Sequence, residues 1–161
     1  MDIFEFALQM EKDGEEFYRK LAETCNDIGL KNILTMLADE EVDHYRIIEQ
    51  LSKRDENAGK AQSQLLDNVR NVFVRMKDEN KDFDIECSQA DSYRKAREIE
   101  EKSMNFYIER ANESGGKEKE LYLQLAEEER KHVHLMESLV DFVTEPERWL
   151  DNAEWHRFDQ F

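Results

Sequence analysis

Two copies of one motif decide the fold of this chain: Leu37-Ala38-x-x-Glu41-x-x-His44 and Leu125-Ala126-x-x-Glu129-x-x-His132. A second motif precedes each copy: Ala7-x-x-x-Glu11-x-x-Gly14-x-x-Phe17-Tyr18 and Ala96-x-x-x-Glu100-x-x-Ser103-x-x-Phe106-Tyr107. The copies of the first motif lie 88 positions apart and those of the second 89, so one residue was lost or gained between them. Four carboxylates and two imidazoles, repeated in register, are what a two-metal site inside a four-helix bundle needs.

Each motif lies on an apolar stripe with helical spacing. Apolar residues recur every three or four positions over residues 4–21, 30–51, 93–107 and 122–143, which predicts four packed helices. Each stripe is interrupted once, by Glu or by Glu-x-x-His. A charge on the stripe must be buried, and a buried carboxylate without a partner is costly or takes up a proton. Because four carboxylates at one level also repel one another, a pair of divalent cations removes both difficulties.

The composition indicates a helical domain. The chain has 161 residues, one proline and five glycines, and 39% of its residues are charged. This favours long helices over strands, in a single domain over residues 1–161. The net charge of −16 repels phosphate backbones and anionic lipid, so we expect binding to neither nucleic acid nor a membrane surface. A solvated acidic exterior explains this charge more simply than attraction of cations such as Fe²⁺.

The two cysteines and the N-terminus bear on localisation. Cys25 and Cys87 lie far apart and form no Cys-x-x-Cys motif, which indicates neither a disulfide framework nor a zinc knuckle and fits a reducing compartment. The N-terminus is acidic and lacks the pattern of a signal peptide. No apolar run is long enough to cross a bilayer. We therefore expect a cytoplasmic protein.

The connections predict the topology. A short link near Asn26-Asp27 and another at Ser114-Gly115-Gly116 make two antiparallel hairpins. The crossover between the hairpins, residues 52–91, is long for a loop and carries its own amphipathic stripe: Leu65, Leu66, Val69, Val72, Phe73 and Met76. The expected fold is all-α, a ferritin-like antiparallel four-helix bundle with a helix in the crossover between the second and third helices. That helix either caps one end of the bundle or exchanges with a second subunit.

Residues 145–161 form a C-terminal tail. Glu145-Pro146 predicts the end of the last bundle helix. The tail is rich in aromatic residues: Trp149, Trp155, Phe158 and Phe161. We favour packing of these side chains against the bundle or a dimer mate over a role in gating access to the site.

Six side chains form the candidate metal site: Glu11, Glu41, His44, Glu100, Glu129 and His132. In a Glu-x-x-His pair both side chains lie on one helix face about one turn apart, so the Glu can bridge two metals while the His binds one. The four carboxylates balance two divalent ions, and the donor set suits iron or manganese and also admits zinc. His134 and His156 lack a Glu three residues before them, and we interpret them as surface or packing residues.

Two tyrosines and two small residues follow the lone glutamates. Tyr18 and Tyr107 lie seven residues after Glu11 and Glu100, on the same helix faces. Two compatible interpretations are a buried hydroxyl that satisfies a core acceptor, and a hydrogen bond that orients a metal-bound carboxylate and supplies a proton or electron. The small residues at the intervening turn, Gly14 and Ser103, either leave room for an oxygen species or permit close helix packing.

This pattern resembles the rubrerythrin branch of the ferritin-like di-iron proteins, over residues 1–52 and 91–144. The matching residues are Glu11, Glu41-x-x-His44, Glu100 and Glu129-x-x-His132, with Phe-Tyr after each lone Glu. The resemblance implies a centre of two iron ions bridged by Glu41 and Glu129, with the other four side chains as terminal ligands. It also implies reduction of hydrogen peroxide, or of dioxygen, by the di-iron(II) form, followed by electron transfer from a rubredoxin centre.

The sequence departs from the rubrerythrin pattern in two ways. Rubrerythrins often carry a Cys₄ rubredoxin domain, so with two cysteines this chain would receive electrons from a separate protein such as rubredoxin. Rubrerythrins also have an additional Glu one turn after the third-helix ligand, where this chain has Ser103. Alternatives to peroxide reduction are ferritin-like iron binding or ferroxidase activity, and a metal-free structural bundle. By analogy we expect a homodimer.

Overall fold

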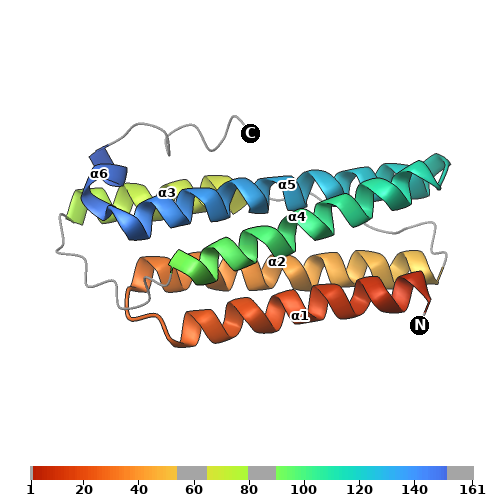
Figure 1. Cartoon of the computed structure of the whole chain (residues 1–161), viewed down its shortest axis with the longest axis horizontal. Coiled ribbons are helices and arrows are strands. Elements are labelled where there is room, and N and C mark those ends of the chain that lie inside the picture. The colour runs from red at the N-terminus through yellow and green to blue at the C-terminus, as the bar shows by residue number, and fades with distance from the viewer. Residues whose placement is uncertain (1, 54–64, 80–89, 152–161) are drawn as a thin grey trace.

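The computed structural model describes residues 2–53, 65–79 and 90–151, and within these ranges the chain forms helices and no strands. The helices are α1 (Ile3–Glu23), α2 (Ile28–Ser52), α3 (Leu65–Glu79), α4 (Ala90–Asn112), α5 (Gly116–Thr144) and α6 (Pro146–Asp151). Four of them, α1, α2, α4 and α5, run side by side as the bundle (Figure 1). The all-α, ferritin-like fold expected from the sequence is confirmed.

The bundle consists of two antiparallel hairpins, α1 with α2 and α4 with α5. In Figure 1, α2 and α4 run in the same direction, while α1 and α5 run in the opposite one. This arrangement requires a connection that returns along the length of the bundle after α2. The helix α3 belongs to that connection, which is why a long crossover separates the hairpins.

Local sequence explains where the bundle helices begin and end. Asp2 and Glu5 form a capping box at the start of α1, in which the Asp2 carboxylate accepts a hydrogen bond from the Glu5 amide at 2.8 Å. Asp27 caps α2 by accepting a hydrogen bond from the Leu30 amide at 2.9 Å. The predicted stop after α5 is confirmed, because α5 ends at Thr144, and Pro146 then opens the short helix α6.

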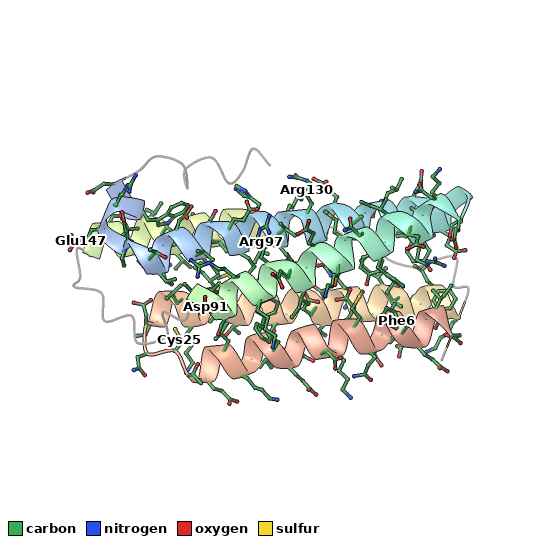
Figure 2. The ribbon with its side chains drawn as sticks, viewed as in Figure 1. Phe6, Cys25, Asp91, Arg97, Arg130 and Glu147 are labelled. Carbon is green, nitrogen blue, oxygen red and sulfur yellow. The ribbon has the colours of Figure 1, made fainter. Side chains whose placement is uncertain are left out.

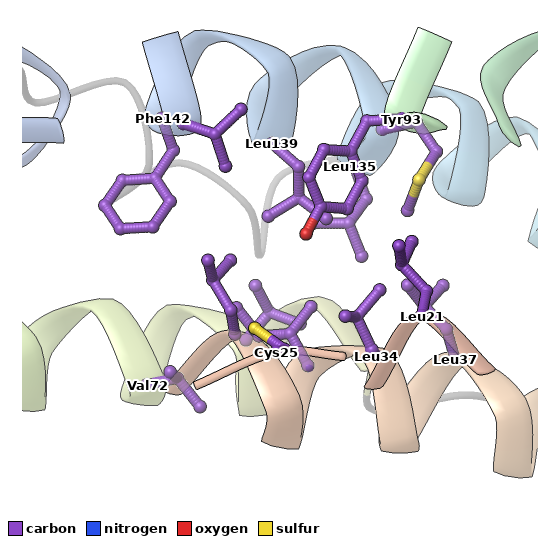
Figure 3. Packing of buried hydrophobic residues seen from close by; sticks show 14 of the residues in the cluster. Leu21, Cys25, Leu34, Leu37, Val72, Tyr93, Leu135, Leu139 and Phe142 are labelled. Atoms are coloured by element: carbon purple, nitrogen blue, oxygen red, sulfur yellow. The ribbon is translucent and has the colours of Figure 1, made fainter. Parts of the chain in front are cut away.

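The apolar core is divided into two hydrophobic clusters. The first contains the C-terminal part of α1, the N-terminal parts of α2 and α4 and the C-terminal part of α5, and Figure 3 shows some of its residues, including Leu34, Tyr93 and Leu139. The second contains the opposite ends of the same helices, including Ile48 and Leu125. Between the two clusters lies the layer of bundle residues that carries the predicted metal ligands.

The helix α3 packs on the bundle of its own chain. The four described apolar side chains of its predicted stripe are buried: Leu65, Val69, Val72 and Phe73. The Phe73 ring contacts Phe142 of α5 and Trp149 of α6, with centroids 5.3 and 5.7 Å apart. The first aromatic residue of the predicted tail, Trp149, is therefore part of the core.

Two other expectations fall partly outside the described residues. Cys25 is disulfide-bonded, contrary to the expectation drawn from the cysteine spacing. The other cysteine, Cys87, lies outside the described residues, as do the remaining tail aromatics and His156. None of the described helices is long and apolar enough to span a membrane.

Charged side chains lie on the outside of the bundle (Figure 2). Arg97 of α4 donates to Glu137 of α5 at 2.8 Å, and Arg130 donates to Glu127 within α5 at 2.7 Å. Such exposed ion pairs contribute little to stability. The exterior therefore supports solvation, while the buried charges are concentrated in the layer between the two hydrophobic clusters.

Candidate metal centre

The structure brings all six predicted ligands together in one buried layer. Each bundle helix contributes to it, α1 and α4 with one carboxylate each, and α2 and α5 with a Glu-x-x-His pair each. None of the six side chains belongs to a residue more than 4% exposed: Glu11, Glu41, His44, Glu100, Glu129 and His132. The apolar stripes of the four helices place these positions at the same level, which is why residues up to 121 positions apart meet.

The six side chains form two overlapping groups of possible ligands. One group is Glu11, Glu41, His44 and Glu129, and the other is Glu41, Glu100, Glu129 and His132. In each group one donor atom per residue lies within 4.8 Å of all the others. Glu41 and Glu129 belong to both groups, as expected for carboxylates between two ions. Their role as ligands stays a prediction that this geometry supports.

The imidazoles point their Nδ1 atoms toward carboxylates of other helices. His44 Nδ1 lies 3.0 Å from Glu129 Oε1 and 3.6 Å from Glu11 Oε2. His132 Nδ1 lies 3.3 Å from Glu41 Oε1. The two rings are nearly parallel, with centroids 5.6 Å apart and an interplanar angle of 17°. Nδ1 is therefore the atom through which each histidine would bind a metal.

The two buried tyrosines form reciprocal hydrogen bonds between α1 and α4. The Tyr18 hydroxyl donates to Oε1 of Glu100, and the Tyr107 hydroxyl donates to Oε1 of Glu11. Burial, followed by the charges of nearby glutamates, raises the pKa of both phenols well above the ordinary value, so both keep their protons. Each tyrosine thus orients the carboxylate of the other sequence repeat, a pairing that spacing along the chain did not predict.

The environment separates the carboxyl groups into two kinds. Burial raises the pKa of Glu129 to about 8, and the charge of Glu100 acts in the same direction. The pKa of Glu41 is also raised well above its ordinary value, first by burial and then by the charge of Glu100. Burial opposes ionisation of Glu100 too, but the positive charge of His132 and the hydrogen bond from Tyr18 help to lower its pKa to about 2.

The pKa values of Glu11 and of the two histidines are also set by burial acting against nearby charges. Burial alone would raise the pKa of Glu11, but the neighbouring Glu41 carboxyl, the charge of His44 and the hydrogen bond from Tyr107 lower it overall. Burial disfavours the charged imidazoles, but the carboxylates around them outweigh this and hold the pKa of His44 and His132 well above the ordinary value. These pKa shifts favour the protonated forms of the two shared glutamates and both histidines without metal, and four such protons would neutralise the layer as two divalent cations would.

The unsatisfied atoms of this layer fit a pair of cations. Buried polar atoms nearly always have a hydrogen-bond partner. Here four buried atoms that face one another across the layer have none: Glu11 Oε2, Glu41 Oε1, Glu129 Oε2 and His132 Nδ1. Carboxylate oxygens and imidazole nitrogens are the donors that iron, manganese and zinc accept. The types of donor atom, their burial and their lack of hydrogen-bond partners therefore fit two divalent metal ions.

Two further glutamates, absent from the predicted site, lie beside the histidines. Glu40 Oε2 is 3.9 Å from His44 Nε2. The repeat-related residue Glu128 is 4% exposed, lies one turn before His132, and contacts Lys131 Nζ at 3.3 Å. A carboxylate near the outer nitrogen of a metal-binding histidine fixes the orientation of the ring. The repeat contained this information, because a Glu stands four residues before each histidine.

Gly14 has a steric role beyond its two earlier interpretations, because it makes room for the side chain of Glu41. A Cβ at position 14 would lie 2.9 Å from Glu41 Oε2 and 3.2 Å from Glu41 Cδ. Glycine therefore lets a predicted bridging carboxylate lie directly against α1. Its counterpart Ser103 is buried, and its hydroxyl donates to the Ile99 carbonyl at 3.1 Å within α4.

The comparison with protein-family models identifies one match. The model described as Rubrerythrin matches residues 2–140, a range that includes all six predicted ligands and both tyrosines. Neither the curated proteins nor the solved structures gave a match. The matched range covers most of the chain, with α1, α2 and α4 in full and α5 up to residue 140. The chain therefore belongs to the rubrerythrin family.

Proposed function

We propose that this protein is a non-haem di-iron oxidoreductase that reduces hydrogen peroxide or dioxygen. The observation that carries the proposal is the pair of ligand groups that share Glu41 and Glu129 inside one buried layer. A mononuclear site would not need two such groups, and a structural bundle would not bury four carboxylates at one level. Membership of the rubrerythrin family supports the same conclusion.

The proposal assigns a place to each ligand. Glu11 and His44 would hold one ion, Glu100 and His132 would hold the other, and Glu41 and Glu129 would be shared by both. Two ferrous ions, when bound, supply one electron each to the O–O bond of the substrate. The same donors accept manganese or zinc, and metal analysis of the purified protein distinguishes these cases.

The remaining residues hold the site in position and limit the access of water from its two ends. Tyr18 and Tyr107 fix the orientation of the two terminal carboxylates and retain their hydroxyl protons next to them. The two hydrophobic clusters above and below the layer exclude bulk water, which strengthens each electrostatic interaction inside it. In this proposal the tyrosines are positioning residues for the glutamates.

Electron supply and assembly complete the proposal. In this proposal, electrons come from a separate carrier protein such as rubredoxin. We take the protein to be a homodimer. A mass measurement in solution tests the assembly, and reduction of the oxidised protein by added rubredoxin tests the donor.

The test begins with protein purified without air. We expect two iron ions per chain, rapid consumption of stoichiometric peroxide by the ferrous protein, and the visible absorption of the oxidised di-iron form. A Glu41→Ala/Glu129→Ala variant serves as the control and should bind no metal pair. If peroxide leaves the ferrous wild-type protein unchanged, the proposal of peroxide reduction is wrong.

A second candidate function is iron oxidation or iron handling without peroxide reduction. Ser103 favours it, because this position carries a serine where the rubrerythrin pattern has an additional Glu. This candidate predicts that the ferrous protein turns over with dioxygen while peroxide oxidises it no faster. Storage of iron would further require a hollow shell of subunits, which the mass of a dimer would exclude.

A further inference from the structure

A cavity of about 330 Å³ lies between α1 and α4 and reaches the predicted metal layer. Its inner end is formed by Glu41, Glu100 and Tyr18. Lys95 and Asp13, both exposed, stand at its outer end. The cavity therefore connects solvent with one side of the layer.

The walls of the cavity are mainly apolar. Met10 and Phe17 of α1 and Ile99 of α4 line it and are partly exposed. Gly14 and Ser103 also line it, and their small side chains leave the space between the two helices open. Such half-exposed apolar walls beside a polar inner end are typical of sites for small organic molecules.

The sequence repeat shows that the two sides of the bundle differ at one position beside this opening. In the repeat, which relates α1 to α4 by 89 positions, Lys95 corresponds to Phe6, and Phe17 corresponds to Phe106. Phe6 and Phe106 contact each other, with ring centroids 5.3 Å apart and an angle of 43°. On the side of the bundle where the cavity lies, Phe17 takes the place of Phe106 and Lys95 takes the place of Phe6. One Phe-to-Lys difference between the repeats thus replaces a ring that contacts its partner ring by a lysine at the outer end of the cavity.

We propose that this cavity binds small organic hydroperoxides, an inference that rests on the proposed function. The hydroperoxide group lies toward Glu41 and Glu100, and the alkyl or aryl group lies against Met10, Phe17 and Ile99. The size supports this class, because one water molecule occupies about 30 Å³ in the liquid and hydrogen peroxide is only slightly larger. A cavity of this volume is at the lower end of the range for organic ligands, about 300–1,000 Å³.

The reaction balances without a further reactant. The hydroperoxide ROOH takes up two electrons and two protons, its O–O bond breaks, and the products are the alcohol ROH and water. The two ferrous ions of the proposed function supply the two electrons, and the carrier protein later returns them. The protons come from solvent through the open end of the cavity.

The main experiment compares two oxidants on the ferrous protein, hydrogen peroxide and cumene hydroperoxide. We expect wild-type protein to react with both. Lys95→Phe introduces the ring that the other repeat has at this position, beside Phe17, and the ratio of the cumene hydroperoxide rate to the peroxide rate should fall by about tenfold or more. Lys95→Ala keeps the cavity open and should keep the wild-type ratio. Lys102→Phe, which adds a ring at an exposed position of α4 outside the cavity, should keep it as well.

A second readout does not depend on iron. Cumyl alcohol, the product, is titrated into the metal-free protein while the backbone amide resonances of Gly14 and Ser103 are followed. We expect saturable shifts in the wild-type and Lys102→Phe proteins and their loss in Lys95→Phe. If the protein reacts with hydrogen peroxide but not with cumene hydroperoxide, this inference alone is wrong. The same holds if it reacts with hydrogen peroxide but shows no saturable shift. No reaction with either oxidant overturns the peroxide reduction of the proposed function.

Discussion

At the scale of single residues, Gly14 links helix geometry to the metal ligands. Glycine costs a helix about 1 kcal/mol relative to alanine, so Gly14→Ala should raise the stability of the metal-free protein by up to that amount. The new Cβ, however, would lie 2.9 Å from Glu41 Oε2, and the carboxylate must move away. We therefore predict higher stability without metal and weaker metal binding, measured by thermal unfolding with and without Mn²⁺.

Ser103→Ala is the matched control for Gly14→Ala. It removes a hydroxyl that bonds within α4 and adds no atom near Glu41. Its metal affinity should remain that of the wild-type protein. Unchanged Mn²⁺ affinity in Gly14→Ala would show that the Glu41 position seen here is not required for binding.

The buried tyrosines allow a second test at this scale. Tyr18→Phe removes the donor to Glu100, a hydrogen bond to an ionised group, and should lower the free energy of unfolding by about 1.5–3 kcal/mol. The pKa of Glu100 should also rise from about 2, because one of the interactions that lowers it is lost. Urea denaturation measures the first effect, and NMR titration of the carboxyl group measures the second.

Tyr93 provides the control for Tyr18→Phe. Its hydroxyl is buried and has no hydrogen-bond partner among the described residues, so Tyr93→Phe removes no interaction. This variant should be as stable as the wild-type protein or slightly more stable. Equal destabilisation by the two variants would contradict a specific role for the bond between Tyr18 and Glu100.

At the scale of the helices, the metal layer adds polar contacts between two hairpins that also share both hydrophobic clusters. Within each hairpin the helices pack closely, and across the layer the polar contacts run between hairpins, as from His44 on α2 to Glu129 on α5. Each predicted ligand group takes donors from both hairpins. Bound metal therefore holds the hairpins together, in addition to any effect on the individual helices.

Metal removal should consequently destabilise the whole bundle. A ligand present at 100 times its dissociation constant stabilises the folded state by about 2.7 kcal/mol. We predict a clear rise in the unfolding temperature on addition of Mn²⁺ or Zn²⁺ and its loss on treatment with a chelator. An unfolding temperature that is independent of these metals in the wild-type protein would contradict the predicted site.

At the scale of the whole molecule, protons and metal ions compete for the same layer. The pKa of Glu129, about 8 when folded, lies well above its ordinary value, and those of Glu41 and both histidines are also raised. The folded metal-free protein then binds more protons than the unfolded chain at neutral pH. Its stability should fall as the pH rises from about 5 through 8, because the slope follows the difference in bound protons. Urea denaturation across this range checks the sign.

Metal binding should show the opposite dependence on pH. Two divalent ions displace the protons on two glutamates and two histidines, so up to four protons leave per chain at neutral pH. Calorimetry of Mn²⁺ binding in buffers with different protonation enthalpies counts them. Affinity that is independent of pH between 6 and 8 would show that these groups are already deprotonated without metal.

The repeat predicted the fold and the six candidate ligands because both depend on periodicity. A carboxylate on an apolar helical stripe must enter the core, and two copies of Glu-x-x-His on neighbouring stripes must meet there. The same repeat contained Glu40 and Glu128, but these residues lie next to the apolar stripe and not on it, so the periodicity did not indicate them. The cysteine spacing led to a wrong expectation, since distance along the chain does not limit distance in space.

The sequence by itself determined the helices, the level at which the charges are buried and the donor types available to a metal. The tertiary structure decided which tyrosine meets which glutamate, that Gly14 makes room for Glu41, and that Lys95 rather than a second ring stands at the outer end of a cavity on one side. The physical reason is that periodicity defines the face of a helix, whereas contacts between faces depend on how the two hairpins are rotated and packed against each other.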